Sequence, residues 1–191
     1  MDQAITIVSG LPRSGTSLMM QMLESGGMEI VTDNIRTADA DNPKGYYEFE
    51  KVKKIKHDSS WLKNTRGKAF KAVSMLLYDL PSEERYKIIF MKRNMDEILS
   101  SQKKMLERLG NKSGPDDDEM QRLFTVHLDN TYLWLKRQKN IDVLYISYND
   151  LILDPLTAAK TAEQFLGGNL NVEKMAGVID RSLYRNRGKN E

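Results

Sequence analysis

The sequence predicts an α/β fold in which a parallel sheet is covered by helices on both faces. Short runs rich in Val, Ile, Tyr and Phe recur along the chain, as expected of strands. Stretches with a helical pattern separate these runs, and this alternation favours parallel pairing through crossover helices. The expected strands are "AITIVS" (4–9), "AFKAVS" (69–74), "YKIIFMK" (86–92) and "DVLYIS" (142–147).

The expected helices lie between and after these strands. Three are predicted over 16–25, 94–109 and 155–166, and the longest over 116–139. The longest opens with "PDDD", which places acidic side chains where a helix N-terminus favours them. Mostly apolar residues recur along it at spacings of three and four, so one face should pack on the core and its histidine should be a core histidine with hydrogen-bond partners. That face comprises Met120, Leu123, Phe124, His127, Leu128, Thr131, Trp134 and Leu135.

Length and composition predict a single domain over residues 1–191. A chain of 191 residues, 40% of them hydrophobic, can bury one core of ordinary size. The loop 109–114 and the turn 41–45 are too short to be domain linkers. A net charge of +2 is too small to indicate nucleic acid or an anionic membrane as a partner.

Further features restrict the class of protein. No cysteine is present, which excludes disulfides and cysteine-based metal sites. No stretch approaches the roughly 20 apolar residues of a membrane span. The opening "MDQAITIVSG" lacks the pattern of a signal peptide. We therefore expect a cytoplasmic protein, and nothing in the sequence indicates its oligomeric state.

A glycine-rich turn, "SGLPRSGTSLMMQML" (9–23), follows the first strand and leads into a helix. Gly10 and Gly15 permit a tight turn, and the backbone N–H groups and the helix dipole attract an anion. Arg13 supplies a forked cation suited to phosphate or sulfate. The alternative is a serine- and glycine-rich turn that only caps the helix. The candidate anion-binding residues are Arg13, Ser14, Gly15, Thr16 and Ser17.

Two parts of a nucleotide triphosphatase are missing from this pattern. A Walker A loop has a lysine where Thr16 stands. A magnesium-dependent enzyme also needs an aspartate at the end of a following strand. The third strand ends in Lys92 and Arg93, and Asp150 lies too far beyond the fourth. We therefore predict a phosphate ligand that needs no Mg²⁺, and no metal site.

A second anion signal lies in "MKRNMDEILSSQKKM" (91–105). Arg93 stands at the end of a strand, and Ser101 follows eight residues later, slightly more than two helical turns. The two side chains can therefore share a face and clamp a second phosphate. The alternative is a surface arginine and a solvated serine.

Together these segments resemble the sulfotransferase superfamily, which uses 3′-phosphoadenosine 5′-phosphosulfate (PAPS). "GLPRSGTSLMMQML" looks like the family's 5′-phosphosulfate loop, and its form is similar to that of tyrosylprotein sulfotransferases and many bacterial members. The spacing of Arg93 and Ser101 resembles the 3′-phosphate motif. "VLYISYNDLILDPLTAAKTAEQFLG" (143–167) is similar to a segment common in bacterial members. The resemblance implies a P-loop-kinase-like parallel sheet and sulfuryl transfer from PAPS without a metal.

The chain also departs from the family. It is short, and cytosolic members have lysine where Arg13 stands. Their R-K-G triplet, which touches the 3′-phosphate, has only a loose analogue around Arg185 and Arg187. Their catalytic histidine has no clear counterpart here.

The resemblance also implies roles for single residues. Arg13 is expected to neutralise the bridging oxygen and the transferring sulfuryl group. Asp33 is the expected general base, because it follows Arg13 at nearly the offset at which tyrosylprotein and heparan-type members carry a glutamate base. Glu48 and His57 are its competitors, and His57 sits in a lysine-rich stretch typical of a solvated surface histidine.

Two other functions stay open from the residues alone. One is a small-molecule or nucleotide kinase that uses ATP and Mg²⁺. The other is a nucleotide-binding module without catalytic activity. For a sulfotransferase, we expect a hydroxyl or amine acceptor of small-molecule or glycan type, and the sequence does not distinguish among acceptors.

Overall fold

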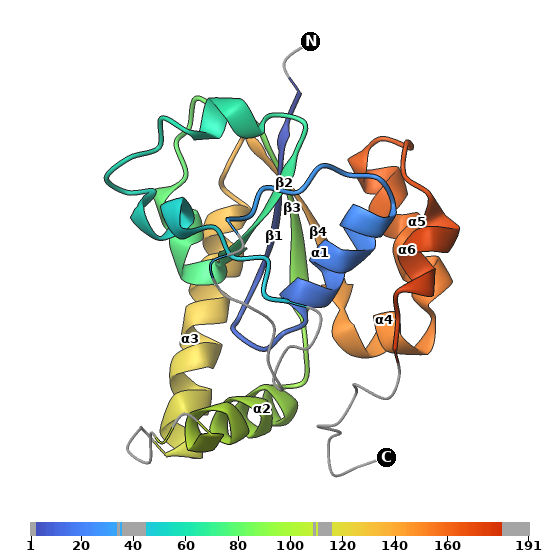
Figure 1. Cartoon of the computed structure of the whole chain (residues 1–191). Helices are drawn as coiled ribbons and strands as arrows, with labels where there is room; N and C mark the ends of the chain where they lie inside the picture. Colours follow the sequence, from blue (N-terminus) through green and yellow to red (C-terminus); the bar gives the residue numbers. More distant parts are fainter. Residues whose placement is uncertain (1–2, 34, 36–44, 109, 111–115, 181–191) are drawn as a thin grey trace.

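Four parallel strands form the centre of the molecule in this computed structural model, which describes residues 3–33, 35, 45–108, 110 and 116–180. They lie in the order β2-β1-β3-β4, and all three pairings are parallel (Figure 1). The expected parallel α/β sheet is therefore confirmed. The strands are β1 (Ile5–Gly10), β2 (Ala69–Val73), β3 (Tyr86–Lys92) and β4 (Ile141–Ser147).

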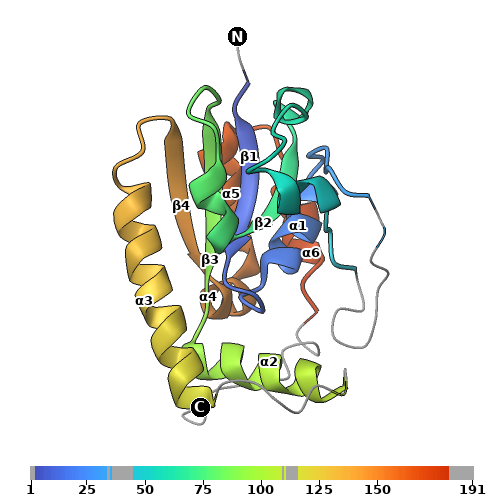
Figure 2. The ribbon, with the colours of Figure 1, turned by 90° about the vertical axis from the view of Figure 1, so that its left-hand side faces the viewer.

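Helices cover both faces of the sheet (Figures 1 and 2). One face packs against α1 (Thr16–Ser25), α4 (Tyr148–Leu153), α5 (Pro155–Leu166) and α6 (Val172–Gly177). The other packs against α3 (Asp117–Leu135) and the 3₁₀ helices η1 (Glu50–Lys54), η2 (Leu62–Thr65) and η3 (Ser74–Asp79). α2 (Met95–Arg108) lies beyond the carboxyl ends of the strands.

The core consists of two apolar clusters, one on each face of the sheet. Every residue of β1 is buried, because a central parallel strand is covered on both sides. The methionines of α1, such as Met19 and Met22, fill the first cluster, as their pattern predicts. Phe70, Phe90 and Trp61 fill the second. The carboxyl ends of all strands consequently meet at one edge, where ligands of parallel sheets bind.

Some sequence expectations needed correction. α3 ends at Leu135 rather than at 139, because Arg137 N–H bonds back to the Trp134 carbonyl at 3.0 Å and closes a tighter turn. Leu123, expected on the buried face, is 49% exposed. The loop 109–114 and the turn 41–45 lie mostly outside the described residues. No helix among the described residues combines the length and apolarity that crossing a membrane requires.

Candidate active site

The turn between β1 and α1 requires both of its glycines. A Cβ on Gly10, whose φ is 150°, would lie 2.7 Å from the carbonyl oxygen of Met91. A Cβ on Gly15, whose φ is 97°, would clash with the ring of Tyr148. Close approach of β3 and α4 therefore explains why glycine stands at both ends of the loop.

The N-terminus of α1 is open to a ligand. Its N-cap residue, Gly15, offers no side-chain cap, and the first turn carries no acidic residue. The free N–H groups and the helix dipole thus favour an anion here. The Ser14 hydroxyl is buried within the loop and has no hydrogen-bond partner among the described residues. The loop therefore has the donors that a phosphate needs.

Arg13 joins the two predicted anion motifs. Its φ of 70° is unusual for a residue with a side chain. Its Nε donates a hydrogen bond of 2.9 Å to the hydroxyl of Ser101, which is buried in α2. The phosphate loop and the segment after β3 are consequently in direct contact.

Arg93 contacts the backbone of the loop and holds it in place. Its Nε pairs with Glu97 at 2.8 Å, and the two side chains are only 8% and 2% exposed. Its Nη1 donates to the Arg13 carbonyl oxygen at 3.0 Å, and its guanidinium lies 4.3 Å from the centre of the Tyr148 ring. The alternative of a surface arginine is wrong. Burial raises the pKa of Tyr148, so its ring stacks on the cation as a neutral phenol.

The sequence analysis missed Lys71 of β2. Its Nζ donates to Ser17 Oγ at 3.3 Å and to the carbonyl oxygen of Tyr46, beside the first turn of α1. It adds a cation to the loop. A signal was present, because a lysine flanked by the buried Phe70 and Ala72 near the carboxyl end of a parallel strand has reason to point into a site.

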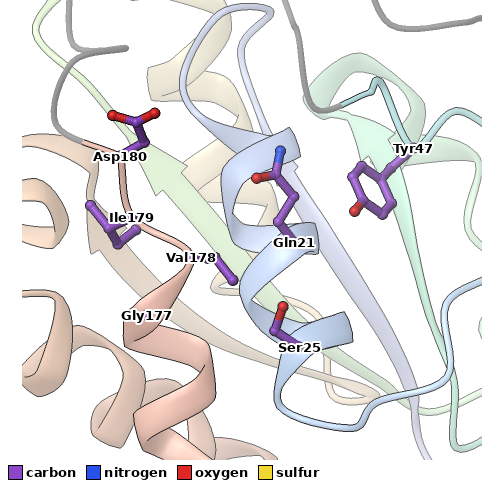
Figure 3. A pocket seen from close by; sticks show the side chains of 7 residues that line it. All are labelled: Gln21, Ser25, Tyr47, Gly177, Val178, Ile179 and Asp180. Atoms are coloured by element: carbon purple, nitrogen blue, oxygen red, sulfur yellow. The ribbon is translucent and has the colours of Figure 1, made fainter.

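A cavity of about 450 Å³ opens along α1, beyond its phosphate-binding turn (Figure 3). Gln21 and Ser25 project from α1, with Tyr47 on one side and the chain Gly177–Asp180 on the other. Gln21 is 7% exposed, and its Oε1 has no hydrogen-bond partner among the described residues. A buried polar atom of this kind costs free energy until a ligand or water satisfies it.

Asp33 lies in a segment that pairs with the chain before η1. Its Oδ2 accepts the backbone N–H of Glu50 at 2.6 Å, and its Oδ1 accepts that of Ile35 at 3.1 Å. These hydrogen bonds, that of Glu50 first, hold the pKa of the Asp33 carboxyl below its usual value. A low pKa is the opposite of what a general base at neutral pH needs.

Glu48 lies beside Asp33, whose backbone N–H donates to the Glu48 carbonyl oxygen at 3.2 Å. Glu48 contacts Lys53 at 3.6 Å, and its carbonyl oxygen accepts the Thr32 hydroxyl. His57 is exposed, as expected of a surface histidine. Arg185 and Arg187 lie outside the described residues. Among the residues that the structure describes, no group of three or more His, Asp or Glu side chains is placed to hold a metal ion.

The fold and the site define a class of protein: an α/β domain with a glycine-rich turn and an open helix N-terminus after its first strand, and with threonine at the position of the Walker lysine. The sequence profile of the Sulfotransferase domain family matches residues 3–191, so the chain belongs to that family. The predicted sulfotransferase enzyme is confirmed. Because the superfamily takes its sulfuryl group from PAPS, the predicted co-substrate is confirmed with it.

Solved structures agree on the fold. Mouse sulfotransferase SULT7A1 complexed with PAP has a TM-score of 0.61 at 20% identity, over 98% of this chain and 69% of that one. The sulfotransferase domain of the Synechococcus PCC 7002 olefin synthase has a TM-score of 0.57 at 16% identity, over 98% of this chain and 82% of that one. The sulfotransferase domain of the curacin biosynthetic pathway has a TM-score of 0.55 at 14% sequence identity, and the match covers 94% of this chain and 79% of that one. No curated protein matches significantly.

Proposed function

We propose that this sulfotransferase acts on a hydroxyl or amine of a small-molecule or glycan-type acceptor, and that Arg13, Lys71 and the open turn of α1 form its transfer site. The Arg13–Ser101 hydrogen bond of 2.9 Å carries the proposal, because it joins the two anion-binding segments at one point. We further propose that the chain works as one cytoplasmic domain.

The reaction needs little covalent help from the protein. The acceptor oxygen or nitrogen bonds to sulfur while the bond from sulfur to the bridging phosphate oxygen breaks, and adenosine 3′,5′-bisphosphate leaves. Negative charge grows on the bridging oxygen. Arg13 and the N–H groups of the first turn of α1 are arranged to stabilise it, and Lys71 adds a second cation beside Ser17.

Arg93 and Ser101 remain our candidates for the 3′-phosphate. Arg93 already contacts Glu97 and the Arg13 carbonyl oxygen, so its first contribution is to hold the loop in shape. Ser101 keeps a hydroxyl beside Arg13 Nε, where a second anion can share it. A phosphate bound here therefore tightens the same network that shapes the loop.

The residues present fit an adenine nucleotide. The first turn of α1 carries no side-chain cap and no acidic residue, and the buried Gln21 Oε1 lacks a partner among the described residues in the cavity along α1. Gln21 lies four residues after Ser17, which is about 6 Å along a helix. That distance suits a nucleoside whose 5′-phosphate sits at the helix N-terminus, so we assign the base edge to Gln21.

Thermal unfolding with nucleotides tests this function without knowledge of the acceptor. Adenosine 3′,5′-bisphosphate should raise the melting temperature without added metal. At about 100 times its Kd a ligand stabilises the fold by roughly 2.7 kcal/mol. Adenosine 5′-monophosphate lacks the 3′ group and should stabilise the protein much less.

The rival functions give different results in the same assay. A kinase would be stabilised by ATP with Mg²⁺ and not by the bisphosphate, and that result would overturn the proposal. Transfer of radiolabelled sulfuryl groups from PAPS to members of an acceptor panel separates an enzyme from a module that only binds the nucleotide. Bisphosphate binding with no transfer to any acceptor would support the module.

A further inference from the structure

α3 packs on the sheet mainly through its C-terminal half. Thr131 and Leu135 are its buried residues, and the rest of this fully described helix is partly or wholly exposed. Its N-terminal half extends beyond the sheet toward α2, where Asp117 pairs with Lys103 at 3.8 Å (Figure 2). Helices in proteins gain most of their stability by packing one face against a partner. The N-terminal half of α3 has little such packing within the described part of the chain.

An apolar seam follows the outward side of α3. Leu123, Val126 and Leu133 are 49%, 55% and 53% exposed. The spacings along this side alternate between four and three residues, which is the repeat of a coiled-coil seam. At 3.6 residues per turn, the buried Thr131 and Leu135 point away from it. The outer seam comprises Glu119, Leu123, Val126, Asn130, Leu133 and, in the turn that closes the helix, Arg137.

The outer seam matches a second copy of itself in the reverse direction. Opposed residues then pair about one centre of symmetry, at the level of Leu128, as a two-fold axis requires. The pairs are Glu119 with Arg137, Leu123 with Leu133, and Val126 with Asn130. In a parallel pair of helices, Glu119 would instead lie opposite the Glu119 of the other copy. The order of residues along the seam therefore favours antiparallel packing.

The charges at the two ends of α3 favour the same arrangement. Four consecutive carboxylates, at 116–119, lie at the N-terminal end, and three cations, Lys136, Arg137 and Lys139, lie at the C-terminal end. All seven residues are exposed. Antiparallel copies bring each acidic end beside a basic end, and the positive end of each helix dipole lies beside the negative end of the other. The charge pattern is thus complementary to itself.

We propose that two copies of this chain form a dimer through the outer seam of α3, packed antiparallel about a two-fold axis near Leu128. The dimer buries the three exposed aliphatic side chains of each seam. Asn130 is the polar residue among them, and a buried asparagine in such a seam costs stability but specifies the register. The contact is about 27 Å long and one helix wide. It is smaller than the roughly 800 Å² per partner of a standard interface, so the dimer should dissociate on dilution.

Sedimentation velocity of the full chain measures this association. From about 5 to 500 μM, a range suited to a weak contact, the average mass should rise from that of the 22.0 kDa chain toward twice that value. Leu133→Glu places a carboxylate opposite Leu123 of the other copy and should weaken association at least about tenfold. The matched control is Gln121→Glu, an exposed position of α3 that points away from the seam and should leave association unchanged.

Two results of this measurement would overturn the proposal. A wild type that stays monomeric at every concentration would mean that another part of this chain, or a different protein, covers the seam. Equal weakening by Leu133→Glu and Gln121→Glu would place the contact elsewhere on the molecule. Both substituted positions are exposed, so the melting temperatures of the variants should stay near that of the wild type.

Cross-linking tests the antiparallel register, and the chain has no cysteine of its own to interfere. Leu123→Cys and Leu133→Cys are oxidised separately and as an equimolar mixture, at the highest concentration of the sedimentation series. Like positions lie about 15 Å apart along the dimer, beyond the reach of a disulfide, whereas Leu123 and Leu133 are opposed. The mixture should therefore form a covalent dimer and each variant alone should not. Cross-linking of either variant alone, or none in the mixture, would contradict the proposed packing even if Leu133→Glu did not fold.

Discussion

The phosphate loop, with the residues that brace it, and the segment that carries Asp33 are built differently. The donor side, which comprises Arg13, Arg93, Glu97, Ser101 and Tyr148, is held by charged and stacked contacts between side chains. The segment that carries Asp33 and Glu48 is held instead by hydrogen bonds to the backbone: the Asp33 carboxylate accepts the Glu50 N–H, and the Glu48 carbonyl oxygen accepts the Thr32 hydroxyl. Preorganised charge suits a phosphosulfate whose charges are fixed, whereas a carboxylate whose charge is already stabilised by backbone N–H groups is a weak base.

The largest effect should come from Arg13 on the donor side. Arg13→Ala removes the cation beside the bridging oxygen and the bond to Ser101. Loss of one preorganised donor costs roughly 10²–10³-fold in kcat, and we expect at least that loss in a PAPS transfer assay. Arg13→Lys keeps the positive charge but loses the forked N–H donors of the guanidinium group. Its rate should therefore lie between those of the wild type and Arg13→Ala.

Two measurements separate this effect from unfolding. The melting temperature of Arg13→Ala should stay near that of the wild type, since the side chain is not part of either apolar cluster. Arg122→Ala removes an exposed arginine of α3 and should leave the rate unchanged. Near-normal turnover of Arg13→Ala would contradict the assignment of the loop.

The buried ion pair should dominate the stability of the donor side. Arg93→Ala leaves the Glu97 carboxylate buried without its cation. Breaking a buried pair in this way typically lowers the free energy of unfolding by about 3–5 kcal/mol, which urea unfolding measures. Arg66→Ala, which breaks the more exposed pair with Glu84, is the matched control and should cost about 1 kcal/mol or less. Equal losses in the two variants would mean that Arg93 does not brace the loop.

The contrast between these two regions also explains which parts of the fold and the site could be predicted from the sequence. The strands, the glycine turn and the Arg93–Ser101 spacing are local patterns, and the structure brings the last two into direct contact. Arg13 and Ser101 are 88 residues apart, so no spacing rule connects them. Lys71 was overlooked because a single lysine in a strand is easily assigned to solvent. Asp33 was chosen by its offset from Arg13, which carries no information on what holds its carboxylate.

A smaller effect should come from Ser101. Ser101→Ala removes the hydroxyl that accepts from Arg13 and, in our proposal, contacts the 3′-phosphate. One hydrogen bond is worth about 1 kcal/mol, so the affinity for adenosine 3′,5′-bisphosphate should fall about fivefold by calorimetry. Adenosine 5′-monophosphate should be affected less. This variant isolates the 3′-phosphate better than Arg93→Ala, whose damage to the loop would weaken both ligands.

The smallest effect on catalysis should come from Asp33, and it tests whether this residue is the base. Asp33→Asn keeps a side-chain oxygen for the Glu50 N–H but removes the carboxylate. If Asp33 only positions the chain before η1, kcat should change little. A loss of about 10²–10⁴-fold would instead make Asp33 the base. Melting curves across pH supply the control. The lowered pKa of Asp33 means that its ionised form stabilises the fold above the unfolded-state pKa, and this stabilisation is lost as the pH falls through the lowered value. The wild type should therefore melt above Asp33→Asn at pH 7, and the difference should shrink in acid while the two rates stay alike.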